Sequence, residues 1–158
     1  MMSEAMKFRT FSERETASAA AAELLAGLVR SDLASSPNQH ASLVVSGGST
    51  PGRCFDLLSQ QDLDWGRVTV VPSDERWVPG DHPDSNERLI RKRLLKGSAA
   101  MGKTLPFYRA GIEAAQAPPL IEKELADLQR PFSATLLGMG EDGHTASLFP
   151  GHPALNET

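Results

Sequence analysis

Three short polar stretches of this chain carry the residue types that bind anions or transfer protons. The first is "GGST", residues 47–50, the second is "DER", residues 74–76, and the third is "GMGEDGHTASLFP", residues 138–150. Glycine-rich turns present backbone N–H groups to anions, an arginine can clamp a phosphate or carboxylate, and a histidine beside an aspartate can accept a proton. These stretches are therefore the candidates for a binding or catalytic site.

The third stretch admits two interpretations. Its first six residues, 138–143, fit the G-x-G-x-x-G pattern of a dinucleotide-binding loop. Such a loop belongs to a first βαβ unit, and the acidic residue that binds the ribose follows about 20 residues later. Here the pattern comes late in the chain, and Glu141 and Asp142 inside it would repel a pyrophosphate. The catalytic interpretation is therefore favoured, with His144 as the candidate general base and Asp142 beside it.

The other histidines and the single cysteine predict no further chemistry. The spacing of His40, His82 and His152 does not match a metal-ligand pattern, so we expect no metal site. Cys54 has no histidine near it in the sequence, and we expect an inert buried thiol. A lone cysteine fits a reducing compartment, which predicts a cytoplasmic protein.

The first stretch is typical of a strand-to-helix turn that can hold an anion. It lacks the lysine of a P-loop, so a nucleoside triphosphate is not expected, and an ordinary capped turn is the alternative. The residues that would line the anion site are Gly47, Gly48, Ser49 and Thr50.

The second stretch places charged side chains just beyond an apolar run. Arg76 could bind an anion, and Asp74 or Glu75 could orient it or bind sugar hydroxyls. A surface ion pair is the alternative for this stretch alone. Asn86 follows Ser85 at a helix start, where we expect a cap first and a substrate contact second.

The elements around these stretches alternate between strand and helix. We expect strands at 41–46, 67–71 and 132–138, and a short one near Phe107. The expected helices begin at a Ser12–Glu15 capping box, at Thr50–Pro51, at Ser85 and before Leu120. This alternation predicts one α/β domain, residues 1–158, with a mainly parallel sheet. Since the three polar stretches follow strands, they should meet at the carboxyl edge of that sheet as one composite site.

Composition excludes two classes of partner. The net charge is −4 and no apolar run approaches the roughly 20 residues of a membrane span, so we expect neither nucleic acid nor a membrane as a partner. The locally basic segment 88–93 has apolar residues at helical spacing and is interpreted as a solvated helix face.

The blocks "SGGSTP", "SDERWVPGDHPDSNERL" and "GMGEDGHTASLFPGHPAL" resemble the signature blocks of the 6-phosphogluconolactonase family. The resemblance implies a Rossmann-like three-layer sandwich, shared with glucosamine-6-phosphate deaminase/isomerase. It also implies hydrolysis, without a cofactor, of 6-phospho-D-glucono-1,5-lactone to 6-phospho-D-gluconate in the oxidative pentose phosphate pathway. By resemblance His144 is the general base, Asp142 orients it, residues 47–50 line the phosphate-sugar site and Arg76 binds an anion.

Two alternatives remain at this point. A deaminase/isomerase carries a glutamate a few residues beyond D-G-H, and Phe149 occupies that place here. The resemblance covers nearly all of this chain but about the N-terminal two-thirds of a family member, so we expect a sheet that is incomplete at its C-terminal side. A truncated, non-catalytic sugar-phosphate-binding protein is therefore the second alternative, and the oligomeric state is not predicted.

Overall fold

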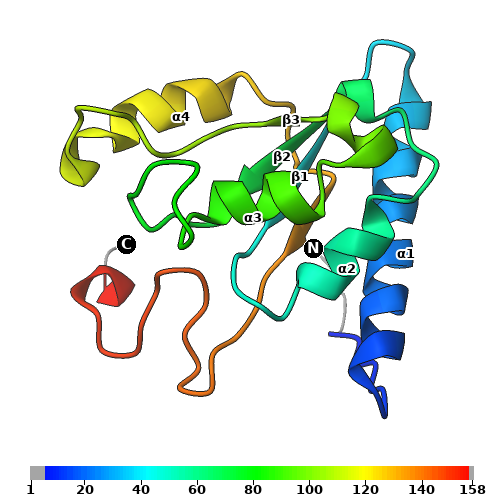
Figure 1. Ribbon diagram of the computed structural model, residues 1–158, viewed down its shortest axis with the longest axis horizontal. Helices are drawn as coiled ribbons and strands as arrows, with labels where there is room; N and C mark the ends of the chain where they lie inside the picture. Colours follow the sequence, from blue (N-terminus) through cyan, green and yellow to red (C-terminus); the bar gives the residue numbers. More distant parts are fainter. Residues whose placement is uncertain (1–5, 157–158) are drawn as a thin grey trace.

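The computed structural model describes residues 6–156 and shows a parallel sheet flanked by helices (Figure 1). The strands are β1 (Ala41–Val45), β2 (Val68–Pro72), β3 (Lys103–Thr104) and β4 (Ala134–Leu136). The helices are α1 (Arg14–Ser35), α2 (Gly52–Leu58), α3 (Asn86–Arg93) and α4 (Pro118–Ala126). Short 3-10 turns lie at Trp65–Arg67, Gly97–Met101, Ala114–Gln116 and Pro153–Asn156.

The strand order is β3-β2-β1-β4, and every pair is parallel. β1 is central, with Val45 opposite Pro72 on β2 and opposite Leu136 on β4. The carboxyl ends of these three strands therefore lie side by side, and each is followed by one of the polar stretches. The predicted α/β class and parallel sheet are confirmed.

The core forms where α1 and α2 pack together against the sheet. β1 and β2 are almost entirely buried, as expected for strands covered on both faces, and α1 contributes a stripe that includes Leu25 and Val29. Phe55 and Leu58 of α2 are fully buried in this core. This core holds the carboxyl ends of β1 and β2 rigidly in place.

The connections place helices on both sides of the sheet. The chain moves in one direction from β1 through β2 to β3, so right-handed crossovers put α2 and α3 on the same face. β4 lies on the side of β1 away from β2, so the connection from β3 through α4 to β4 runs in the reverse direction. This connection places α4 on the face of the sheet opposite to α2 and α3. No residue of α4 is buried, so that layer is thin.

Four local predictions differ from the structure. The strand expected at 132–138 is limited to Ala134–Leu136. α1 starts after Glu13 rather than at a Ser12 capping box, because the Glu15 carboxylate instead accepts hydrogen bonds from Arg53 at 2.6–2.9 Å. α2 starts after Pro51, one residue later than expected, and Thr50 is not its cap. The strand expected near Phe107 lies at Lys103–Thr104, since Pro106 has no N–H with which to continue the ladder.

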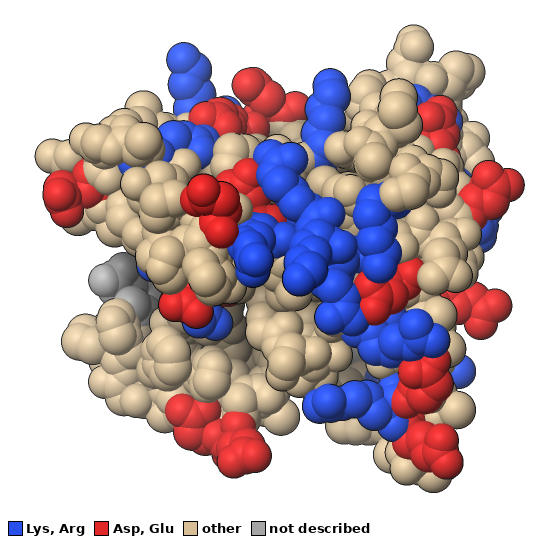
Figure 2. All heavy atoms as spheres, in the orientation of Figure 1, with Lys and Arg blue, Asp and Glu red and all other residues tan. Residues whose placement is uncertain are grey.

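Basic side chains gather over α3 and the adjoining end of α2 (Figure 2). Most of the basic side chains that make ion pairs here contact an acidic side chain that is less exposed. Arg91 pairs with Glu87, and Arg93 and Lys96 both pair with Asp56. This surface agrees with the interpretation of 88–93 as a helix face. Within residues 6–156, no helix is both long enough and apolar enough to span a bilayer.

Candidate active site

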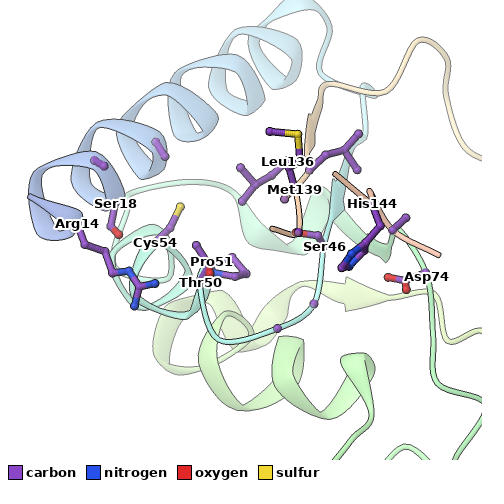
Figure 3. Close-up of a pocket in the computed structure, with 18 of the residues that line it drawn as sticks. Arg14, Ser18, Ser46, Thr50, Pro51, Cys54, Asp74, Leu136, Met139 and His144 are labelled. Atoms are coloured by element: carbon purple, nitrogen blue, oxygen red, sulfur yellow. The ribbon is translucent and has the colours of Figure 1, made fainter. Parts of the chain in front are cut away.

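The three polar stretches enclose a cavity of about 370 Å³ at the carboxyl edge of the sheet. Its lining includes Gly47, Gly48, Thr50, Asp74, Arg76 and His144. Figure 3 shows His144 and Asp74 together at one end, and Arg14 beside Thr50 at the other. The composite arrangement predicted from the sequence is therefore present, with three exceptions. Ser49, Asn86 and Asp142 do not line the cavity.

The loop after β4 folds tightly enough to turn His144 back over its own start. Gly140 N–H donates to the His144 carbonyl at 2.8 Å, and Gly143 N–H donates to the Gly140 carbonyl at 2.9 Å. Gly143 has φ +87°, which favours glycine. A Cβ on Gly140 would lie 2.2 Å from the imidazole, so the ring packs directly on the bare Cα. The G-x-G-x-x-G spelling thus reflects a turn built around a histidine.

Asp142 holds the imidazole through one nitrogen. Its Oδ1 lies 2.6 Å from His144 Nδ1 and 3.1 Å from the His144 backbone N–H. The hydrogen bond from the His144 side chain, followed by that from its backbone, lowers the pKa of Asp142. Because an ionised carboxylate can only accept, Nδ1 carries the proton and Nε2 is the basic nitrogen. The Phe149 ring stacks on the imidazole, with ring centroids 4.6 Å apart.

Glu75 serves α3 rather than the cavity. Its carboxylate accepts the backbone N–H groups of Asn86 at 2.8 Å and Glu87 at 2.9 Å, and the Ser85 hydroxyl at 3.2 Å. Ser85 in turn caps the helix by accepting from Arg88 N–H, as the sequence predicted. A carboxylate at a helix N-terminus is stabilising, so Glu75 is a structural anchor.

The buried residue Asn86 lies between the loop that contains Gly47 and the loop that contains Asp74. The residue is 3% exposed, and its Nδ2 donates to the Asp74 carbonyl at 2.9 Å. A Cβ on Gly47 would lie 1.8 Å from Asn86 Oδ1, so the glycine is required for this contact. The prediction of a cap first and a substrate contact second places Asn86 correctly at the helix start. Its substrate contact stays a prediction, and the structure shows the side chain turned to protein.

The side chains of Arg76 and Arg14 line the cavity. Among the described residues neither Arg76 nor Arg14 makes an ion pair, whereas nearby Arg53 and Arg93 do. Arg76 was predicted from the sequence. Arg14 was not, because an arginine in the first turn of a helix carries no local signal of what it faces, and only the packing of α1 beside α2 brings it here.

Cys54 also lines the cavity, although it is 3% exposed. Burial raises the pKa of its thiol to about 11, which agrees with the expected inert cysteine. Within residues 6–156, no three acidic, histidine or cysteine side chains gather as metal ligands would.

Comparison with known proteins places this geometry in a family. The family model of glucosamine-6-phosphate isomerases/6-phosphogluconolactonase matches residues 12–158. The chain belongs to this family. It is 46% identical over 145 residues to a 6-phosphogluconolactonase of Pseudomonas aeruginosa, covering 92% of this chain and 60% of that one. With a 6-phosphogluconolactonase of Rhizobium meliloti it shares 48% identity over 117 residues, covering 74% of this chain and 50% of the relative.

Solved structures of the family have the same fold. A 6-phosphogluconolactonase from Shewanella baltica superposes with a TM-score of 0.86 at 38% identity, over 90% of this chain and 60% of that one. The enzyme from Trypanosoma brucei gives a TM-score of 0.75 at 30% identity, over 95% and 65% of the two chains. This chain thus spans between 50% and 65% of the length of these four family members.

Proposed function

We propose that the protein hydrolyses 6-phospho-D-glucono-1,5-lactone to 6-phospho-D-gluconate, with His144 as general base. Nε2 takes a proton from water as the oxygen attacks the lactone carbonyl. The tetrahedral intermediate then collapses with cleavage of the bond between the carbonyl carbon and the ring oxygen, which receives the proton from His144. The new carboxylic acid ionises and releases one proton to solvent.

The observation that carries this proposal is the state of the His144 ring within the cavity. Nδ1 is occupied by Asp142, so the free Nε2 is available to water. Arg76 and Arg14 supply positive charge on the same cavity, where a phosphorylated substrate and a developing oxyanion both need it. The relatives named 6-phosphogluconolactonase support this substrate.

The packing of Phe149 favours lactone hydrolysis over sugar-ring opening. The resemblance to the family implies that a deaminase carries a glutamate at the position of Phe149, where it assists the histidine. Here the Phe149 ring stacks on the imidazole at an interplanar angle of 25°. A phenyl ring transfers no proton, and simple hydrolysis needs no second acid at that position.

The decisive experiment measures lactone hydrolysis above the spontaneous rate, by proton release in a weakly buffered indicator solution. His144→Gln should remove the enzymatic part, because general-base catalysis contributes about 10²–10⁴-fold. His40→Gln is the matched control, since His40 is exposed just before β1, at the opposite edge of the sheet. Binding of 6-phosphogluconate without acceleration would instead establish a sugar-phosphate-binding protein. Ammonia released from glucosamine 6-phosphate would establish the deaminase.

We also propose a cytoplasmic location. The single cysteine is a buried free thiol in this structure, which suits a reducing compartment.

A further inference from the structure

One hydrogen bond ties the histidine loop to the neighbouring loop. Ser147 Oγ donates to Asp74 Oδ2 at 2.7 Å, joining residues 73 positions apart in the chain. Among residues 6–156, every other hydrogen bond of residues 138–150 joins two residues between 138 and 152. The loop is also loosely packed, since Met139, Leu148 and Phe149 are 80%, 51% and 47% exposed. The Ser147 hydroxyl is therefore its principal polar tether.

Asp74 is fixed independently of that loop. Its Oδ1 accepts from Asn86 Nδ2 and from Ser73 Oγ, both at 3.3 Å. Its carbonyl also accepts from Asn86, which Glu75 holds at the start of α3. Both carboxylate oxygens of Asp74 thus have protein partners, and the contacts with Asn86 fix the group to the buried start of α3.

The tether also restrains a strained turn. Ala146 lies between His144 and Ser147 with φ +52°, in the left-handed region that residues with a Cβ rarely adopt. A residue in this conformation persists where its surroundings hold it there. Two backbone hydrogen bonds between Thr145 and Leu148 close this turn, and the bond from Ser147 to Asp74 adds a restraint from outside it.

We propose that Ser147 is a positioning residue, which holds His144 at the cavity by bonding to Asp74. The inference rests on the proposed function, and it changes the role expected for Asp74. The sequence placed Asp74 among substrate-binding residues, whereas here it anchors the loop that carries the base.

The kinetic test compares Ser147→Ala with Ser147→Thr. The alanine variant should lower kcat about tenfold, which is about 1.4 kcal/mol, with KM within about twofold, because the loop loses its charged acceptor while the cavity wall stays. The threonine variant keeps a hydroxyl and should retain most of the activity. Ser35→Ala is the matched control, since the Ser35 hydroxyl also donates at 2.7 Å but lies at the far end of α1.

A second variant tests the strain. Ala146→Gly in the Ser147→Ala background should recover part of the lost kcat, since glycine adopts positive φ at little cost. No recovery, or a threonine variant as impaired as alanine, would overturn the proposal.

A spectroscopic readout separates this proposal from the proposed function. The Phe149 ring stacked on His144 should shift the imidazole Cε1–H resonance upfield in the wild-type chain. Ser147→Ala should move that resonance toward its random-coil position while the thermal unfolding midpoint stays unchanged. If the wild-type chain hydrolyses no lactone, the proposed function fails. The resonance still tests whether the bond from Ser147 to Asp74 positions His144. An unmoved resonance in Ser147→Ala refutes it.

Discussion

Replacing Gly140 by alanine should displace the proposed catalytic base without unfolding the domain. The added Cβ would lie 2.2 Å from both Cε1 and Nδ1 of His144 and 2.8 Å from Asp142 Oδ1. Carbon atoms in contact need about 3.5 Å, so the imidazole must retreat by about 1 Å. A misplacement of that size costs about 10²-fold in rate, or about 2.7 kcal/mol of transition-state stabilisation.

Gly138→Ala is the matched control within the same loop. Its Cβ would meet only Ser46 Oγ, at 3.5 Å, which is ordinary contact. Neither Gly138 nor Gly140 has a positive φ, so the two substitutions differ chiefly in what the methyl group meets. Both variants should unfold at the wild-type temperature, because the loop is largely exposed.

The assay is the initial rate of lactone hydrolysis, with the spontaneous rate subtracted. We expect Gly140→Ala to lower kcat far more than it changes KM, and Gly138→Ala to resemble the wild type. Equal losses in the two variants would mean that the loop tolerates no side chain at all. Wild-type kcat in Gly140→Ala would show that the position of His144 does not limit the reaction, and the reasoning would be wrong.

The remaining predictions concern buried and paired groups away from the loop. Cys54, whose pKa is raised to about 11 by burial, should react with iodoacetamide at pH 8 only slowly in the folded protein and rapidly in urea; fast labelling without urea would contradict its burial. Asp56→Asn should lower the free energy of unfolding by about 2 kcal/mol in urea titrations at pH 7, since it removes the charged acceptor shared by Arg93 and Lys96, both partly exposed. Asp32→Asn, at a half-buried position, is its control. The hydrogen bond from Arg93, with that from Lys96, lowers the pKa of Asp56, so its contribution is complete above the unfolded-state pKa near 4 and is lost as the pH falls through the lower folded value. The difference in stability between wild type and Asp56→Asn should therefore stay constant from pH 7 to pH 5 and shrink below pH 4.

Local sequence predicted the elements wherever one strong local signal was present. The apolar runs that became β1 and β2, and the Ser85 cap of α3, were placed within one residue. Prediction failed where a side chain found a better partner far along the chain. Glu15 pairs with Arg53 instead of closing a capping box, because the guanidinium bonds to both carboxylate oxygens at once and a backbone N–H can bond to only one.

The roles of the site residues were likewise predictable where they depend on nearby residues, and were not predictable where they depend on distant ones. His144, Asp142 and Gly143 act on one another within a few residues, so their spacing alone indicated an acid and a base on a tight turn. The roles of Asp74 and Asn86 depend on loops and helices that meet only in the folded chain. The structure shows the Asn86 amide and the Ser147 hydroxyl both bonded to Asp74, and the substrate contacts expected of Asp74 and, second to its place at a helix cap, of Asn86 stay predictions.

The sequence by itself thus determined the parallel α/β fold, the edge of the sheet that carries the cavity, and the histidine that lines it. These follow from hydrophobic periodicity and from local turn chemistry, which act over a few residues. Only the tertiary structure decided that Arg14 joins the cavity, that Glu75 anchors a helix, and that Ser147 reaches Asp74. Such contacts depend on the relative placement of whole elements, which the packing of the core fixes and no short stretch of sequence encodes.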